Sequence, residues 1–278
     1  MVNLNGSIIP SKEVKLGNEN RAFKYGDGIF ETIKIQNNKL VFFEDHYFRL
    51  MASMRMLRMK IPMRFTLEFL QKEILKTVKQ ITKESIVYRA RLTVYRKDGG
   101  LYLPNTNEVD YLIDIIPVNS ASKNTYKVDL YKDFYNYSGL LSTVKTTNRM
   151  LNTLASVFAE ENDLDSCIIL NENKRVVETT NGNIFLVKGT TIKTPSLTEG
   201  CIKGIIRKKI IEIVTKSPDY KIEETSISPF EIQKANEVFI TNAIIGIQSV
   251  TNYRKKEFST EITRKLKNSL QILGITGG

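Results

Sequence analysis

The chain has 278 residues, of which 41% are hydrophobic and 26% charged, so its composition is that of an ordinary soluble globular protein, and it is long enough for two domains. One histidine and two cysteines argue against a multi-histidine metal site, a disulfide framework and a Ser-His-Asp triad, and we expect no metal. The formal net charge is +11, but lysine and glutamate are interleaved, which favours a lysine-rich surface over a nucleic-acid-binding protein. No apolar run approaches a membrane span and the first residues are not a signal peptide, so we expect a cytoplasmic protein.

Residues 1–118 predict a small α+β domain. Its strands are indicated by alternating apolar residues, and its helices by apolar residues spaced three and four apart. Asn37-Asn38 predicts a tight turn between two strands, and residues 20–27 predict an irregular segment. The predicted strands are 2–9, 29–35, 39–43, 86–96 and 109–118, and the predicted helices are the segment from Glu44 to just before Pro62 and the segment 66–80.

Residues 119–124 are small and polar and form the predicted linker to a larger domain, residues 125–278. Two hairpins are predicted in this domain, with turns at 171–173 and 188–189. The predicted strands are 126–131, 166–170, 175–179, 183–187, 191–194, 237–241 and 246–253, and the predicted helices are 150–161, 205–216, 230–234 and 260–273.

Lys145 is the residue on which the functional interpretation depends. It follows Val144 in a stretch that leads from an irregular segment into the helix predicted from Met150. A lysine held where a loop meets a helix can be partly desolvated, which lowers its pKa and makes the neutral amine available for Schiff-base chemistry. Because most lysines are solvated surface charges, Lys145 gains weight only from the features that follow.

Four further features accompany Lys145. Arg49 lies on the face of an early helix and could bind an anion through two N–H donors. Glu178 ends a strand just before a turn. A glycine-bearing loop over residues 194–204 leads into the helix that begins at Ile205, and such a helix N-terminus offers N–H groups and a positive dipole to a phosphate. Residues 240–243 form a strand-to-loop junction with polar groups.

In this order, these features resemble the class IV aminotransferase family, the fold-type IV pyridoxal-phosphate enzymes. The matching segments span nearly the whole chain, and their order and spacing together are specific. They are Tyr25–Thr32, His46–Leu50, Lys145 with Asn148, Val177-Glu178 with Asn183–Phe185, Thr194–Gly204 with Arg207, and Glu237–Asn242. The resemblance implies a small α+β domain, a larger pseudo-barrel domain, pyridoxal 5′-phosphate as the cofactor, and a homodimer whose partner subunit closes the site.

The resemblance also implies a role for each matching residue. Lys145 would hold the cofactor as a Schiff base and shuttle the α-proton of the substrate. Glu178 would face the pyridine nitrogen and keep the ring protonated, which makes the ring a strong electron sink. Phe30 would line the substrate side and Arg91 would meet a substrate carboxylate. The remaining cofactor-binding residues, most of them around the phosphate, would be Arg49, Asn183, Ile205, Ile206, Asn242 and Ala243.

The motifs most resemble the 4-amino-4-deoxychorismate lyase branch, which releases pyruvate and 4-aminobenzoate. Segments 145–149, 194–197 and 241–243 carry that resemblance. The alternative is an amino-acid transaminase of the same fold that acts on small amino and keto acids, either branched-chain or D-amino acids. The glycine-rich turn of branched-chain enzymes is replaced here by residues 179–182, and the arginine usual in D-amino-acid enzymes by Leu101. A non-catalytic, basic nucleic-acid-binding protein is a distant third hypothesis.

Overall fold

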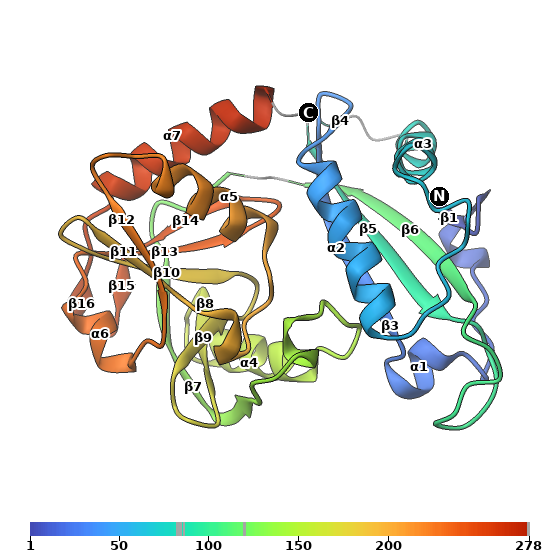
Figure 1. Ribbon diagram of the computed structural model, residues 1–278, viewed down its shortest axis with the longest axis horizontal. Coiled ribbons are helices and arrows are strands. Elements are labelled where there is room, and N and C mark those ends of the chain that lie inside the picture. Colours follow the sequence, from blue (N-terminus) through green and yellow to red (C-terminus); the bar gives the residue numbers. More distant parts are fainter. Residues whose placement is uncertain (82–84, 86, 119–120, 277–278) are drawn as a thin grey trace. The chain divides into compact units, whose positions relative to one another are not determined.

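The computed structural model describes residues 1–81, 85, 87–118 and 121–276, with side chains described as far as residue 274. It comprises two compact units, each of which is described here by itself (Figure 1). The first holds residues 1–118 together with Lys145–Asn148, and the second holds Ala121–Val144 and Arg149–Thr276. The predicted second domain, 125–278, differs in that it included residues 145–148. Residues 119–120 of the predicted linker and residue 86 of a predicted strand lie outside the described residues.

The first unit is built on a six-stranded antiparallel sheet. Its strands are β1 (Val2–Leu4), β2 (Ser7–Ile9), β3 (Gly28–Gln36), β4 (Lys39–Leu40), β5 (Val87–Arg96) and β6 (Val109–Pro117), and its helices are α1 (Arg21–Tyr25), α2 (Phe43–Met56) and α3 (Leu67–Val78). The strand order is β2-β1-β6-β5-β3-β4, and α2 packs on β3 and α3 on β6. Buried side chains such as Ile33, Leu92 and Ile113 fill the face that the two helices cover.

The second unit contains two five-stranded sheets. One comprises β10 (Asn183–Lys188), β11 (Thr191–Pro195), β12 (Lys221–Thr225), β13 (Glu237–Asn242) and β14 (Gly246–Val250), and the other comprises β7 (Lys127–Asn136), β8 (Ser166–Asn171), β9 (Val176–Thr179), β15 (Asn252–Tyr253) and β16 (Lys256–Glu257). Their orders are β12-β11-β10-β13-β14 and β16-β15-β7-β8-β9. One buried apolar cluster takes Leu130 and Ile168 from the second sheet and Leu186 and Val238 from the first, so the two sheets share a core.

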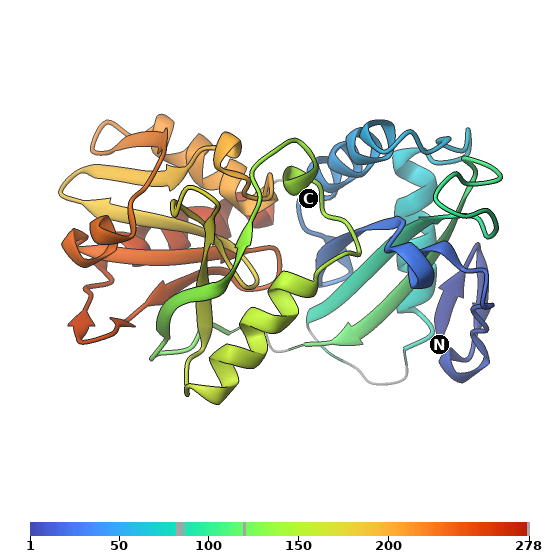
Figure 2. The same cartoon turned by 90° about the horizontal axis from the view of Figure 1, so that it is seen from below.

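Four helices complete the second unit. They are α4 (Met150–Glu161), α5 (Ile205–Thr215), α6 (Pro229–Lys234) and α7 (Glu261–Thr276). Figure 2 shows α4, in yellow-green, beside strands β7 and β8, where Ala155 and Ala159 pack against Tyr131 and Ile169. Helices α5 and α7 contact each other and the strands of the other sheet. Among the described residues, no helix is both long and apolar enough to cross a membrane.

The structure corrects several predicted elements. The strand predicted over residues 2–9, in which Gly6 was expected to suit a turn or bulge, is a hairpin, because Asn5 and Gly6 have φ angles of 54° and 97° and turn the chain between β1 and β2. The segment 20–27, predicted to be irregular, contains α1, because the side chain of Asn20 accepts the N–H of Phe23 and caps the helix. The strand predicted over 39–43 ends at Leu40, where the chain turns towards α2. Strand β12 was not predicted, since its polar residues show no apolar alternation.

Candidate functional site

Lys145 lies in an extended segment that pairs with β3 inside the first unit. The carbonyl oxygen of Lys145 accepts the N–H of Phe30 at 2.9 Å, and the N–H of Thr147 donates to the carbonyl of Gly28 at 2.8 Å. A Cβ atom on Gly28 would lie 3.2 Å from Cβ of Tyr95 and 3.3 Å from the Thr147 side chain, so the close approach favours glycine. The backbone on both sides of Lys145 is therefore fixed against a strand.

The aromatic ring of Phe30 carries two cationic groups. Nζ of Lys145 lies 4.3 Å from the ring centroid, and Cζ of Arg91 lies 3.7 Å from it. Phe30 pairs with Thr93, whose hydroxyl accepts a hydrogen bond from Nε of Arg91 at 3.3 Å. The structure thus brings together the predicted residues Lys145, Phe30 and Arg91. A guanidinium stacked on a ring beside an amine is suited to bind the carboxylate of an amino acid.

Arg49 lies on helix α2, which covers the other face of this sheet. Its Nε donates to Oε1 of Glu31 at 2.7 Å, and its Nη2 donates to Oε2 at 2.5 Å. Because side chains alternate along a strand, Glu31 faces α2 whereas its neighbour Phe30 faces the opposite way. The predicted phosphate-binding arginine is therefore held in a bidentate ion pair beneath α2.

His46 completes this buried ion pair. Its Nδ1 lies 2.7 Å from Oε2 of Glu31, and the two residues are only 1% and 2% exposed. Burial by itself would raise the pKa of Glu31, but the charge of Arg49 and hydrogen bonds from Arg49 and His46 outweigh it and lower that pKa to about 2. Burial lowers the pKa of His46 below 6.5, so its imidazole is neutral at pH 7. A neutral ring beside an ionised carboxylate places the proton on Nδ1, which donates it.

In the second unit, Glu178 and Asn183 both bind the backbone of Ile202. The N–H of Ile202 donates to Oε2 of Glu178 at 2.9 Å, and Nδ2 of Asn183 donates to the carbonyl of Ile202 at 2.8 Å. Glu178 lies in β9 and Asn183 begins β10, and both are buried. The ends of these two strands therefore hold the loop that leads into α5.

Helix α5 begins directly after this loop. Among the described residues, no side chain caps its N-terminus. Helix geometry leaves the N–H groups of Ile205 and Ile206 without an acceptor inside the helix. A Cβ atom on Gly204 would lie 2.0 Å from Oδ1 of Asn183, so any larger residue here would have to displace the side chain of Asn183. The backbone can then present its N–H groups to an anion, which the helix dipole favours.

Thr241 has a buried hydroxyl that lacks a partner. It is 2% exposed, and its Oγ1 is one of two buried side-chain polar atoms in the described part of the chain without a hydrogen bond, the other being Nε of Arg207. Thr241 pairs with Asn183 across β13 and β10, so the two side chains share a face of the sheet. Because Asn183 contacts the loop before α5, the hydroxyl is directed to the same side. An anion bound there would supply the missing partner.

The side chain of Asn242 stabilises a turn. Its Oδ1 accepts the N–H groups of Ile244 and Ile245 at 3.1 and 3.0 Å and shapes the turn between β13 and β14 that contains Ala243. The predicted pair, Asn242 and Ala243, therefore follows Thr241 directly, but it is the side chain of Thr241 that shares a face with Asn183.

Sequence reasoning did not single out Glu31, His46 and Thr241, which form the ion pair with Arg49 or share a strand face with Asn183. For Glu31 a signal was present, because it occupies an otherwise apolar face of a predicted strand, where an ionised group needs a partner. Arg49 and His46 are three residues apart on the next helix and lie on one side of it. The sequence carries no comparable signal for Thr241, whose role depends on the pairing of two distant strands.

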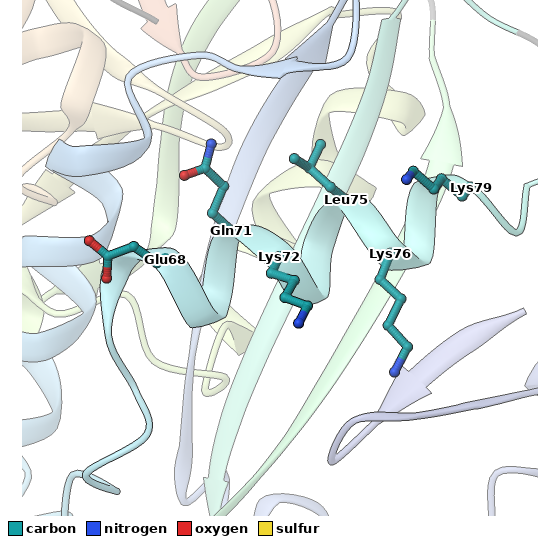
Figure 3. A pocket seen from close by; sticks show the side chains of 6 residues that line it. All are labelled: Glu68, Gln71, Lys72, Leu75, Lys76 and Lys79. Atoms are coloured by element: carbon teal, nitrogen blue, oxygen red, sulfur yellow. The ribbon is translucent and has the colours of Figure 1, made fainter.

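A hollow beside α3 is a weaker candidate for the functional site than the residues described above (Figure 3). Five residues of this helix and its C-cap line it: Glu68, Gln71, Lys72, Leu75, Lys76 and the cap residue Lys79. Figure 3 shows their side chains extending from the helix rather than converging on one point. Among the described residues, no group of three or more His, Cys, Asp and Glu side chains could hold a metal ion.

The chain is similar to known proteins along most of its length. A family model described as "Amino-transferase class IV" matches residues 28–253. The aminodeoxychorismate lyase of Vibrio harveyi is 25% identical over 278 residues, which cover 94% of this chain and 97% of that protein.

Two solved structures show the fold. The branched-chain aminotransferase of Thermoproteus uzoniensis, crystallised with norvaline, superposes with a TM-score of 0.90 at 23% identity, covering 99% of this chain and 94% of that one. The branched-chain amino acid aminotransferase of Thermobaculum terrenum, in its PLP form, superposes with a TM-score of 0.84 at 21% identity, covering 98% and 92%. The expected fold, a small α+β unit and a larger pseudo-barrel unit, is therefore confirmed.

Proposed function

Because the chain belongs to the class IV aminotransferase family, we propose that it is a pyridoxal-phosphate-dependent enzyme in which Lys145 holds the cofactor. The family predicted from the sequence motifs is confirmed, and with it the expectation of an enzyme rather than a non-catalytic nucleic-acid-binding protein. The cofactor of this family, pyridoxal 5′-phosphate, has an aldehyde, a ring nitrogen and a phosphate, and the chain offers a residue type suited to each.

The observation that carries the proposal is the anion-binding arrangement of the second unit. The uncapped N-terminus of α5, the crowded Gly204 and the unpartnered hydroxyl of Thr241 all lie next to Asn183 or on its face. A phosphate would accept hydrogen bonds from the N–H groups of Ile205 and Ile206 and from the Thr241 hydroxyl.

The remaining roles follow from side-chain chemistry. When bound, pyridoxal phosphate supplies an electron-withdrawing ring that stabilises negative charge at the substrate's Cα. Glu178, buried and fixed by the N–H of Ile202, is suited to pair with a protonated ring nitrogen. Nζ of Lys145 is the amine that would hold the cofactor through its aldehyde, with loss of water, and it would serve as the base for the substrate's α-proton when it is not so bound. Arg91, held on Phe30, binds the substrate carboxylate.

We propose the lyase reaction as the specific activity. In this reaction 4-amino-4-deoxychorismate loses pyruvate to leave 4-aminobenzoate. The support is the Vibrio harveyi relative, which spans almost the whole chain, together with segments 145–149 and 241–243. The second candidate is an amino-acid transaminase, favoured by the fold similarity to branched-chain enzymes. Both reactions would begin with removal of the α-proton by Lys145. In the lyase reaction the bond to pyruvate then breaks, whereas in the transaminase reaction the proton is returned to the cofactor side and the amino group is transferred.

One experiment decides between the two reactions. The purified enzyme is incubated with 4-amino-4-deoxychorismate and, separately, with glutamate or a branched-chain or D-amino acid plus a keto acid. Release of 4-aminobenzoate and pyruvate supports the lyase. Amino-group transfer without 4-aminobenzoate would replace it with the transaminase.

A second experiment tests the cofactor itself. The wild-type protein is expected to absorb near the visible range, and borohydride reduction should fix the cofactor to Lys145, as peptide mass spectrometry would show. Lys145→Ala should lose both properties, whereas Lys188→Ala, at an exposed strand end, should keep them. A Lys145→Ala protein that still holds the cofactor covalently and turns over at the wild-type rate would refute the assignment.

The homodimer and the cytoplasmic location predicted from the sequence are also part of this proposal. The second unit exposes apolar side chains along one stripe of α4, with Met150 65%, Leu154 36% and Val157 49% exposed. A second copy of the chain is the partner we propose for this stripe. Light scattering coupled to size exclusion should give twice the mass of 31.8 kDa, and Leu154→Lys should shift the mass towards the monomer.

A further inference from the structure

Helix α5 carries a buried arginine in its first turn, at the end of the helix where the macrodipole disfavours a cation. Arg207 is the third residue of the helix and is only 4% exposed. We propose that Arg207 is a positioning residue whose charge, held beside the N-terminus of α5, strengthens the binding of an anion by the N–H groups of Ile205 and Ile206. The inference rests on the proposed function, in which the cofactor's phosphate binds at this N-terminus, and every residue it uses belongs to the second unit.

Two hydrogen bonds fix the guanidinium of Arg207. Its Nη2 donates to the carbonyl of Pro195 at 2.8 Å and to Oε2 of Glu224 at 2.6 Å. Pro195 is the last residue of β11, and Glu224 lies in β12, the parallel neighbour of that strand. The side chain therefore ties the first turn of α5 to the point where the loop before the helix leaves the sheet.

The side chain of Arg207 also begins next to the residues of the proposed anion site. A Cβ atom on Gly204 would lie 3.4 Å from Cβ of Arg207 and 2.0 Å from Oδ1 of Asn183. The Cα–Cβ bonds of an α-helix tilt towards its N-terminus, so the side chain extends towards the end that offers the N–H groups. Because a buried charge is screened little by water and salt, its attraction for an anion at that end is retained.

Packing alone does not account for an arginine at this position. Nε of Arg207 is buried without a hydrogen-bond partner, and in the described part of the chain the hydroxyl of Thr241 is the other buried side-chain atom of this kind. An unsatisfied N–H and a buried charge both cost free energy, which a methionine of similar length would avoid. A bound anion gives the buried charge a use that packing does not.

Glu224 offsets the charge of Arg207 only in part. The side chain of Glu224 is 44% exposed, whereas that of Arg207 is 5% exposed. Water therefore screens the carboxylate more than it screens the guanidinium, and a net positive potential remains on the buried side. As a consequence, the two members of this ion pair should act on a bound anion with opposite signs.

A purely structural role is the competing explanation, since the same contacts attach α5 to the sheet. If the pair only held the helix in place, removing either member would loosen the site and weaken the binding of the phosphate. If the charge of Arg207 attracts the phosphate, removing Arg207 weakens binding and neutralising Glu224 strengthens it. The direction of the effect at Glu224 therefore separates the two explanations.

The experiment measures the dissociation constants of pyridoxal and of pyridoxal 5′-phosphate for variants of the full chain. Both ligands share the ring and the aldehyde, so the ratio of the first constant to the second isolates the phosphate. Arg207→Met removes the charge at similar length, Arg207→Lys keeps it, and Glu224→Gln neutralises the partner. Lys193→Met is the matched control, because Lys193 forms a surface ion pair with Glu231 from the same strand β11. Thermal unfolding shows whether each variant folds.

We expect the ratio to fall about tenfold in Arg207→Met, to stay within about threefold of the wild-type value in Arg207→Lys, and to rise about threefold in Glu224→Gln. The control should keep the wild-type ratio. An unchanged ratio in Arg207→Met, or a ratio in Glu224→Gln at or below the wild-type value, would overturn the inference. If Arg207→Met does not fold, the half-exposed Glu224 still decides. A wild-type protein that binds pyridoxal as tightly as pyridoxal 5′-phosphate would instead refute the phosphate site at α5, which is a separate and recognisable failure.

Discussion

Replacing Thr241 by valine should have opposite effects on the free and the cofactor-bound protein. Valine has the shape of threonine but lacks the hydroxyl, and the hydroxyl of Thr241 is buried without a partner. A buried polar group left unsatisfied costs about 1–3 kcal/mol. Thr241→Val should therefore stabilise the cofactor-free protein by roughly 1 kcal/mol, which for a chain of this size raises the unfolding midpoint by about 2–4 °C.

The bound protein should respond in the other direction. If the hydroxyl donates to the phosphate, its loss removes a hydrogen bond to a charged group, worth about 1.5–3 kcal/mol. The affinity for pyridoxal 5′-phosphate should then fall by about tenfold or more. The cofactor should consequently raise the midpoint of the variant less than it raises that of the wild type.

The assay is thermal unfolding with and without cofactor, together with a direct titration. The matched control is Thr194→Val, in the same unit, because the hydroxyl of Thr194 is buried and donates to the carbonyl of Ile184 at 2.9 Å. This control should destabilise the free protein, since it leaves a buried carbonyl unsatisfied. The reasoning is refuted if Thr241→Val destabilises the free protein as Thr194→Val does, or if it binds the cofactor with wild-type affinity.

Two other predictions concern acid stability and the approach to α5. Both Glu31 and His46 have folded pKa values below those of the unfolded chain, so each contributes stability at higher pH that is lost on acidification, beginning below about 6.5 for His46 and below 4.5 for Glu31. For Glu31 the loss by pH 3 is about 2 kcal/mol, because the folded pKa of about 2 still lies below that pH, and urea unfolding between pH 7 and pH 3 should show it in the wild type and not in Glu31→Gln. Gly204→Ala should displace the side chain of Asn183 and weaken cofactor binding, as a spectrophotometric titration would show, while Gly139→Ala, which has open space around its Cβ, should be neutral. Wild-type affinity in Gly204→Ala, or a flat acid profile in the wild type, would contradict these expectations.

The parts of the fold that sequence predicted well are the long, periodic ones. The helix predicted over residues 150–161 has those bounds in the structure, and the hairpin of β10 and β11 lies where the alternation and the Lys188-Gly189 turn placed it. Periodicity needs several repeats to be seen, so a helix of five residues such as α1 offers none. Its existence depends on one capping contact from Asn20.

The candidate site divides in a similar way. The motif positions Lys145, Glu178 and Asn183 could be read locally, because each stands at the end of a recognisable element. The contacts that these and other residues make could not be predicted from local sequence. The ion pair of Arg49, for example, depends on how one strand and one helix pack together. Thr241 shows this most clearly, because a shift of one residue along a strand reverses the face on which a side chain lies.

The position of Lys145 has a consequence for dissecting the molecule. Its segment, residues 145–148, clusters with the first unit although the chain before and after it belongs to the second. A gene cut at residue 120 would therefore give one fragment whose sheet lacks the backbone partner of Phe30 and another in which the amine hangs on an unpaired loop. Neither fragment would therefore keep the backbone contacts of Lys145, so the two units must be expressed or exchanged together.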